Sequence, residues 1–407
     1  MLRRIDQEGA EQAPVLDKSR KTPSPPRKSC LRVGFVPLMD AAPLLAAHEL
    51  GYFRDEGIEV ALDRQIGWGN IRDKLTFGRL HAAHALIGMP LFSQLSREWF
   101  SEPLIAVMNL GSGGNAITIS RRLADAGVHS AQTLAEFIRR DPRQEVLAFA
   151  HVFGCSMHHY LLRDWLSAAG IDPDGDIRLR IIPPPQMSQH MAQRHLDGFC
   201  AGEPWNTLAE RDHVGKVIAL TTDIIPDHPE KTLVVTRRWA QQNGPAISGL
   251  IRALLRACEF CDDSANNSRL TEILARPEYI DAPGEVISAS LNLESALIAG
   301  GVHRAHRPRD WRFRSFSQGA TFPSATHSAW LLREMIRWRH VAPSIGERGT
   351  EIALRCVDST AYRAAAESMQ IACPPTDLPP MQLRNRIFDP AGEPALATEG
   401  ATDVTRV

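Results

Sequence analysis

The feature of this chain that most restricts its fold is an alternation of short apolar strands with helices. Strands are expected over Leu31–Val36, Ile58–Leu62 and Ala82–Leu86, with helices over Ala41–Leu50 and from Trp68 onward between them. Strands that alternate with helices in this way indicate βαβ units and a mainly parallel sheet.

The same alternation begins again in the middle of the chain. The second block has these expected helices and strands: Ser130–Arg140, Val146–Phe149, Ser156–Ala169, Ile177–Ile182, Gln186–Leu196 and Val217–Leu220. A strand over Leu233–Thr236 is then expected to return to the first block, and the chain is mainly helical from there to about residue 370. Two α/β lobes joined by crossing strands are typical of a hinged binding protein, whose ligand lies where strand ends converge.

This layout divides the chain into five segments. Residues 31–117 are expected to form the first part of lobe I, and residues 118–231 lobe II. Residues 232–373 are expected to return to lobe I and add the C-terminal helices. The polar, proline-containing ends, 1–30 and 374–407, are predicted to be a disordered arm and a flexible tail.

Charge and composition exclude several classes of protein. With 46 Lys+Arg against 47 Asp+Glu, the net charge is −1, which argues against a nucleic-acid or membrane-surface partner. No apolar run approaches the length of a membrane span. The 7 Cys are scattered, which favours a reducing compartment over a disulfide framework. Because the first 30 residues lack the apolar centre of a secretory signal, we expect a cytoplasmic protein.

Several motifs occur in a fixed order between about Leu31 and Asp262. They are Gly34–Pro37, Ala41–Leu44, Gln65–Asp73, Gly114–Ile117, His158–Trp165, Gly202–Trp205 and His228–Lys231. In this order they resemble the nitrate/bicarbonate substrate-binding proteins of ABC transporters (the NrtA/CmpA type). The resemblance is greatest to their cytoplasmic relatives, the nitrate/nitrite sensors of the NasS type. It implies a two-lobed α/β fold of the periplasmic-binding-protein kind (type II).

The resemblance also implies a set of anion ligands. The tryptophan, histidine, glycine and lysine that hold nitrate in the family correspond to Trp68, His158, Gly202 and Lys231. The family's glutamine corresponds to Asn115, which keeps the amide donor but has a shorter side chain. Taken singly, each of these residues is more typical of packing, a turn or a solvated surface, so the prediction concerns the set.

The chemistry of the set suits an oxyanion that carries no proton. An indole N–H, an imidazole, a backbone N–H at Gly202 and the charge of Lys231 all supply hydrogen bonds to acceptor oxygens. A cation at position 231 favours nitrate or nitrite over bicarbonate, whose O–H needs an acceptor. Neighbouring strand residues point to opposite faces, so Glu230 is expected to point away from the site.

The resemblance implies a sensor function. Such sensors hold an ANTAR-domain antiterminator of the NasT type inactive and release it when nitrate or nitrite binds. One alternative is the periplasmic nitrate-binding component of an ABC transporter. A less favoured one is an enzyme of the thiamin-pyrimidine-synthase type, whose cysteine-rich run is missing here. A Cys155–His158 nucleophile is also disfavoured, because no third orienting group is evident. We therefore expect no enzyme activity, no cofactor and no metal.

Overall fold

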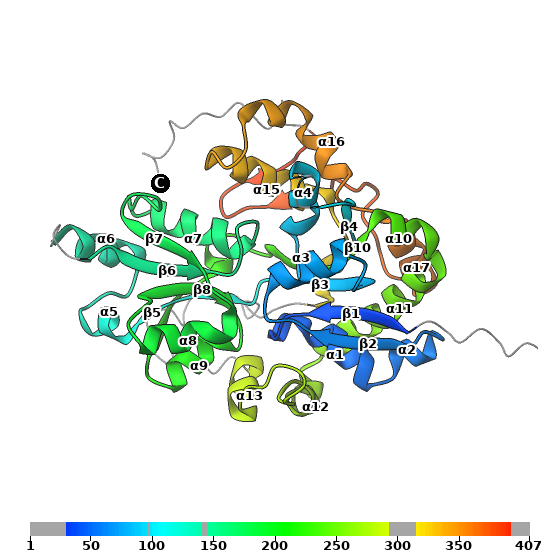
Figure 1. The fold of residues 1–407 in the computed structure, drawn as a ribbon, viewed down its shortest axis with the longest axis horizontal. Helices are drawn as coiled ribbons and strands as arrows, with labels where there is room; N and C mark the ends of the chain where they lie inside the picture. The colour runs from blue at the N-terminus through cyan, green and yellow to red at the C-terminus, as the bar shows by residue number, and fades with distance from the viewer. Residues whose placement is uncertain (1–29, 97, 99, 141–144, 293–314, 392–407) are drawn as a thin grey trace, which may run out of the picture.

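The computed structural model describes residues 30–96, 98, 100–140, 145–292 and 315–391. The chain forms two α/β lobes, each built on a five-stranded sheet, and Figure 1 shows the two sheets next to one another. The two-lobed fold predicted from the alternation of strands and helices is confirmed. The disordered arm expected over residues 1–30 lies outside the described residues except for Cys30.

The sheet of lobe I has the strand order β2-β1-β3-β10-β4. Its strands are β1 (Leu31–Phe35), β2 (Val60–Arg64), β3 (Ala82–Leu86), β4 (Leu104–Ser112) and β10 (Pro229–Thr236). Strands β1, β2 and β3 are parallel, whereas β10 runs antiparallel to β3 and β4. Strand β10 therefore brings a late segment of the chain into the middle of the first lobe.

The sheet of lobe II repeats this plan in the order β7-β6-β8-β5-β9. Its strands are β5 (Asn115–Ser120), β6 (Leu147–His151), β7 (Ile177–Ile181), β8 (Gly198–Gly202) and β9 (Gly215–Leu220). Strand β5 is antiparallel to β8 and β9, so each lobe has one strand that enters from the other lobe.

Two crossing segments join the lobes. The first is Gly113–Gly114, where both glycines have positive φ angles (70° and 82°) that other residues rarely adopt. The second is residues 221–228, and the Gly113 N–H donates to the carbonyl of His228 at 3.0 Å. The expected lobe boundaries after residues 117 and 231 fall inside β5 and β10, because each strand pairs from its first residue with the sheet it enters.

Helices cover the faces of both sheets. Those of lobe I are α1 (Ala42–Glu49), α2 (Tyr52–Asp55), α3 (Trp68–Thr76) and α4 (Gly88–Leu95). Those of lobe II are α5 (Arg121–Asp125), α6 (Ala131–Arg140), α7 (Met157–Ser167), α8 (Pro184–Ala192) and α9 (Trp205–Arg211). The later helices are α10 (Arg237–Gln242), α11 (Gly244–Asp262), α12 (Asn267–Leu274), α13 (Gly284–Asn292), α15 (Ala325–Arg337), α16 (Gly349–Leu354) and α17 (Thr360–Ser368). No described helix combines the length and apolar character needed to span a bilayer.

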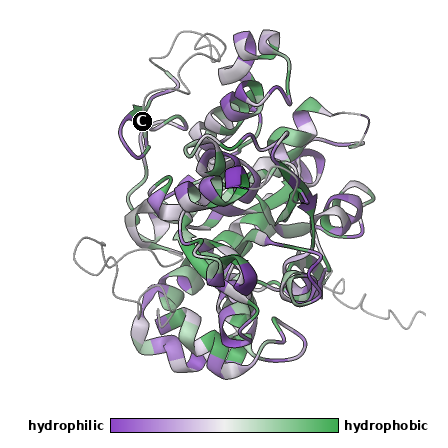
Figure 2. Ribbon diagram, turned by 90° about the vertical axis from the view of Figure 1, so that its left-hand side faces the viewer, coloured by the Kyte–Doolittle hydropathy of each residue, from purple (hydrophilic) through white to green (hydrophobic). Residues whose placement is uncertain are grey.

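The largest apolar core extends from lobe I into lobe II. It contains Phe35 and Leu254 of the first lobe together with Met157, Leu161 and Phe199 of the second. Figure 2 shows the apolar colour concentrated on the central strands. Two hydrogen bonds add to this contact, from Met39 N to Glu203 O and from Trp205 Nε1 to Pro37 O, both 2.9 Å. The lobes are therefore closed against each other.

The segment after residue 373 differs in part from the expected flexible tail over 374–407. Residues 381–388 form a short hairpin, β11 (Met381–Gln382) and β12 (Ile387–Phe388). Phe388 is fully buried and Met381 nearly so, because both pack on the main core. The segment is therefore ordered as far as residue 391, and residues 392–407 lie outside the description.

Candidate functional site

The five residues predicted to hold an anion come from five different elements. Trp68 is the first residue of α3, Asn115 the first of β5 and Gly202 the last of β8. His158 lies in the first turn of α7, and Lys231 lies in β10. Asn115 and Gly202 are direct partners in the sheet of lobe II, whereas Trp68 and Lys231 belong to lobe I. The fold thus carries these residues from both lobes to the crossing segments.

Contacts connect all five residues into one buried group. Lys231 Nζ lies 5.5 Å from the centre of the Trp68 ring, and His158 Nε2 lies 3.1 Å from Asn115 Oδ1. A Cβ atom added to Gly202 would lie 3.1 Å from Asn115 Oδ1. Glu230 links the two halves, because one of its carboxylate oxygens lies 2.9 Å from Lys231 Nζ and 3.8 Å from His158 Nε2.

Lys231 is fully buried between two carboxylates. Its Nζ lies 2.7 Å from Asp40 Oδ2 and 2.9 Å from Glu230 Oε2. Burial alone would lower the pKa of Lys231, but the two carboxylates outweigh it and raise that pKa above its ordinary value. The ammonium group therefore keeps its charge, and it is held in one position by two charge-assisted hydrogen bonds.

The expectation that Glu230 points away from the site is wrong. Strand β10 has irregular register with β4 on both sides of Lys231, where Pro229 pairs with Ser112 and Lys231 with Gly111. Such a bulge breaks the alternation of side chains, so Glu230 and Lys231 reach the same side of the sheet. Burial would raise the pKa of Glu230, yet Lys231 and His158 lower it below its ordinary range.

Asp40 and His84 complete the surroundings of Lys231, and sequence reasoning missed both. Asp40 follows β1, and its Oδ1 lies 2.8 Å from Nε2 of His84, a fully buried residue in the middle of β3. Burial opposes ionisation of Asp40, but Lys231 and then His84 lower its pKa. A polar residue inside the apolar run Ala82–Leu86 was the available signal, because a buried histidine needs a polar partner.

A series of close polar contacts continues from Glu230 to the backbone of Asn115. Nδ1 of His228 lies 3.0 Å from Glu230 Oε1, and its Nε2 lies 2.8 Å from Thr221 Oγ1. The Thr221 hydroxyl donates to the carbonyl of Asn115 at 2.9 Å. We call Asp40, Trp68, His84, Asn115, His158, Gly202, His228, Glu230 and Lys231 the interlobe cluster.

Six buried polar atoms of the interlobe cluster have no hydrogen-bond partner in the described part of the chain. They are the indole nitrogen of Trp68, the amide nitrogen of Asn115, Nδ1 of His84, His158 and His228, and Oε1 of Glu230. Buried polar groups nearly always find a partner, so this set beside one ammonium group requires an explanation. Burial lowers the pKa of His158 to about 3, with Glu230 acting against this effect, so its imidazole is neutral near pH 7. The cluster can therefore supply N–H donors and a positive charge to a small acceptor ligand.

Cys155 is not an activated nucleophile. It is buried, and burial raises the pKa of its thiol to about 12, so the thiolate is scarce at neutral pH. The Cys155–His158 pair that the sequence left open is thereby disfavoured further.

Comparisons with known proteins agree with this geometry. Nitrate import ATP-binding protein NrtC of Synechocystis is 36% identical over 313 residues, which are 76% of this chain and 46% of NrtC. This chain thus spans about half the length of that relative. Nitrate/nitrite binding protein NrtA of Nostoc is 30% identical over 319 residues, covering 76% of this chain and 71% of NrtA.

A solved structure extends the similarity to the whole fold. The crystal structure of the periplasmic nitrate-binding protein NrtA from Synechocystis superposes with a TM-score of 0.80 at 25% identity, covering 90% of this chain and 96% of that one. The two-lobed fold is therefore that of the periplasmic binding proteins. A family model described as the NMT1-like family matches residues 24–275, more than half of the sequence. The chain belongs to the NMT1-like family, among relatives that include the nitrate/nitrite binding proteins of the NrtA type.

Proposed function

We propose that this protein binds nitrate or nitrite in the interlobe cluster. The observation that carries the proposal is the set of buried atoms on Trp68, Asn115 and His158 that lack a partner among the described residues, next to the charged Lys231. A planar oxyanion offers acceptors to the indole and amide N–H groups, and to Nδ1 of His158 once that imidazole takes up a proton, and the backbone at Gly202 lets a ligand approach closely. The names of the relatives NrtA and NrtC, which refer to nitrate, support the same ligand class.

Isothermal titration with four anions tests this proposal. Nitrate and nitrite are expected to bind, whereas bicarbonate is expected to bind at least tenfold more weakly. Lys231 and the indole and amide N–H groups favour oxygens that only accept, whereas the bicarbonate O–H needs an acceptor. Chlorate, which has three oxygens but is pyramidal, measures how strictly the site requires a planar ligand. Absence of binding for both nitrogen oxyanions would contradict the proposal.

We further propose that the protein is a cytoplasmic sensor rather than an enzyme. In this account it holds an ANTAR-domain antiterminator of the NasT type and releases it when the anion binds. The anion must then bind the free protein more tightly than the complex, and a tenfold difference corresponds to about 1.4 kcal/mol of coupling. Buried free thiols at Cys155, Cys200, Cys258 and Cys356 support a reducing compartment.

Lobe closure offers a route from the cluster to a partner surface. Helix α15 contacts lobe II through Arg337, whose Nη1 lies 2.7 Å from Asp164 of α7. A change in closure therefore moves α15 relative to lobe II. Co-purification of the NasT-type antiterminator without nitrate, and its release by nitrate, would support the sensor. A complex that nitrate does not dissociate would contradict the sensor function.

The second candidate function is the periplasmic nitrate-binding component of an ABC transporter. The similarity to the periplasmic protein NrtA favours it. A fusion of alkaline phosphatase to the native N-terminal region separates the two functions, because that enzyme is active only after export. We expect an inactive fusion, and periplasmic activity would favour the transport function.

Replacing Gly202 with alanine should weaken nitrate binding severalfold without unfolding the protein. The added Cβ would lie 3.1 Å from both Asn115 Oδ1 and Leu38 Cδ2, so it presses on both lobes at once. Gly154→Ala is the matched control, since its Cβ meets nothing within 4 Å. Isothermal titration and thermal melting measure the two effects. If the Gly202 variant and the parent bind nitrate with equal affinity, the backbone at Gly202 is not part of the site.

Nitrate binding should take up a proton. Asp40, Glu230 and Lys231 together carry one net negative charge, and a bound anion adds a second. His158, which faces Glu230, Lys231, Asp40 and His228, is the group expected to take up the proton. The imidazole of His158 is neutral in the free protein at neutral pH and protonated in the complex. The affinity therefore falls as the pH rises, by up to about tenfold per pH unit.

Titrations in buffers with different ionisation enthalpies measure this proton directly. The apparent enthalpy of binding should change with the buffer in the parent protein. In His158→Gln this dependence should disappear. Identical heats in all buffers for the parent would contradict the account of the charges.

A further inference from the structure

Gly88 lies in a close contact between the two lobes. It is the buried first residue of α4, directly after β3 of lobe I. A Cβ atom added to Gly88 would lie 2.0 Å from the carbonyl oxygen of Cys155, in lobe II, and 2.5 Å from a methyl carbon of Leu331 in α15. Real Cβ atoms essentially never lie within 3.0 Å of such atoms. The backbone at Cys155 can therefore approach lobe I this closely only because residue 88 has no side chain.

On the side of lobe I, Gly88 is attached to the strand that carries Lys231. The N–H of the preceding residue, Ile87, donates to the carbonyl of Glu230 at 3.1 Å. Leu86, the last residue of β3, is the direct sheet partner of Lys231. The position of Gly88 is thus fixed relative to the backbone of Lys231.

On the side of lobe II, Cys155 is attached to the helix that carries His158. The next residue, Ser156, is the N-cap of α7, and its hydroxyl accepts from a backbone N–H of the first turn at 3.1 Å. The same hydroxyl donates to the carbonyl of Phe153 at 2.7 Å. Because this cap joins residues 153–156 to α7, the carbonyl of Cys155 and the helix move together. The contact with Gly88 thus sets how far His158 lies from the lysine in β10.

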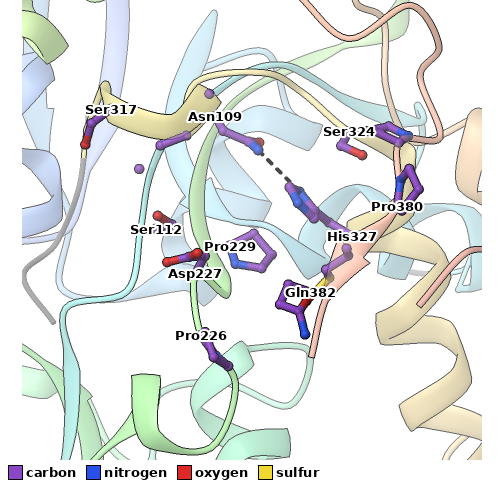
Figure 3. Close-up of a pocket in the computed structure, with 15 residues that line it drawn as sticks. Asn109, Ser112, Pro226, Asp227, Pro229, Ser317, Ser324, His327, Pro380 and Gln382 are labelled. Carbon is purple, nitrogen blue, oxygen red and sulfur yellow. Dashed lines mark hydrogen bonds between the residues drawn. The ribbon is translucent and has the colours of Figure 1, made fainter. Parts of the chain in front are cut away.

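Helix α15 is anchored to lobe I near its beginning. The amide nitrogen of Asn109, in β4, donates to the carbonyl of Phe322 at 2.8 Å and lies 3.3 Å from Nδ1 of His327, as Figure 3 shows for Asn109 and His327. Phe322 lies just before α15, and His327 lies in its first turn. Leu331, one turn further along, is fully buried. We therefore treat α15 as part of lobe I.

The end of α15 contacts α7 of lobe II. Arg337 Nη1 lies 2.7 Å from Asp164 Oδ1, and the hydroxyl of Tyr160 lies 3.1 Å from Nδ1 of His340, just after the helix. Tyr160 and Asp164 are four residues apart, so both contacts hold the same face of α7. These contacts oppose any withdrawal of α7 from Gly88.

We propose, resting on the proposed function, that Gly88 is a positioning residue that sets the width of the anion site between Lys231 and His158. A side chain at position 88 must move the Cys155 carbonyl from 2.0 Å to at least 3.0 Å, and α7 moves with it. Donors from the two lobes then no longer reach the same small oxyanion, because protein hydrogen bonds are about 2.7–3.2 Å long. A larger anion of the same charge can still span the wider site.

Gly88→Ala is tested in the full chain, first without any anion. The Met39 N–H donates across the lobes to the carbonyl of Glu203 at 2.9 Å, so its hydrogen exchange reports closure. In Gly88→Ala this amide should exchange about tenfold faster or more, whereas the amides of β1, which pairs within lobe I, should keep their rates. Gly244→Ala is the matched control, since Gly244 also begins a helix and its Cβ would meet nothing within 4 Å.

Nitrate and perchlorate then measure the width of the site. Both are monoanions without a proton, and perchlorate is the larger. By isothermal titration, Gly88→Ala should lose about tenfold or more in affinity for nitrate and clearly less for perchlorate. A variant that is merely less stable would keep the ratio of the two dissociation constants. If the parent binds neither anion, the proposed function fails, while the exchange of the Met39 amide still tests the position of α7.

If Gly88→Ala does not fold, Arg337→Gln tests the same contact. Arg337 Nη1 lies 2.8 Å from Glu334 of α15 as well as beside Asp164 of α7, so the variant leaves two carboxylates without the guanidinium that they share. The lobes should then separate, and the Met39 amide should exchange faster.

Unchanged exchange of the Met39 amide in a folded Gly88→Ala protein would overturn the role of Gly88. An equal loss of affinity for both anions would do the same. Where Arg337→Gln has to decide, unchanged exchange of the Met39 amide counts against the proposal in the same way.

Discussion

Replacement of Lys231 by methionine is expected to abolish nitrate binding and to destabilise the fold by about 3–5 kcal/mol. Methionine keeps much of the volume but removes the buried charge that lies 2.7 Å from Asp40 and 2.9 Å from Glu230. The two carboxylates then lack their cation, and an incoming anion meets two negative charges. Charge reversal in Lys231→Glu should be more severe still.

A second variant separates lost binding from lost folding. Combining Lys231→Met with Asp40→Asn and Glu230→Gln removes all three charges, so much of the stability should return while nitrate binding stays absent. Lys216→Met is the matched control, because this lysine is exposed on β9. Chemical denaturation and titration calorimetry measure both effects. A Lys231→Met protein that binds nitrate with unchanged affinity would exclude Lys231 from the site.

Trp68→Phe is expected to weaken nitrate binding by about tenfold to a hundredfold, at a far smaller cost in stability than Trp68→Ala. The indole N–H is buried and has no hydrogen-bond partner among the described residues, so phenylalanine removes a donor without breaking a described hydrogen bond. A hydrogen bond to a charged group contributes about 1.5–3 kcal/mol, which corresponds to this loss. Alanine would in addition leave a cavity, at a cost of about 3–5 kcal/mol.

The matched control for this change is Trp330→Phe. Trp330 is a buried residue of α15 outside the interlobe cluster, so its replacement should leave the affinity for nitrate unchanged. If Trp68→Phe binds nitrate as the parent does, the indole serves packing alone. Calorimetry gives the affinities, and thermal melting gives the stabilities.

Local signals in the sequence located most elements correctly. The strand Ala82–Leu86 has the predicted bounds, and α1 ends just before Gly51, whose φ of 79° fits the expected helix end. Ser130 accepts from Thr133 N as the predicted N-cap of α6. The helix expected over Gln186–Leu196 instead spans Pro184–Ala192, because proline is well suited to a first helical turn.

Features that depend on distant residues were harder to predict. The bulge that turns Glu230 toward Lys231 depends on the register of β10 against β4, which the local pattern Pro229–Thr236 does not reveal. Asp40 and His84 are far apart in sequence and meet only across the folded sheet. Phe388 likewise has few apolar neighbours in sequence, but it packs on a core formed elsewhere in the chain.

The predicted site residues, by contrast, were identified from the family resemblance. Trp68, Asn115, His158, Gly202 and Lys231 have no shared local pattern, so periodicity could not have selected them. The structure brings all five together at the crossing segments. Their role as anion ligands remains a prediction.

A crystal structure of the chain with nitrate tests that role most directly. The account predicts one planar anion among Trp68, Asn115, His158, Gly202 and Lys231, accepting from the indole and amide N–H groups that are unpartnered without it. Nitrate bound elsewhere, with Lys231 still held by Asp40 and Glu230 alone, would contradict it, as would a bulky cation in the cluster.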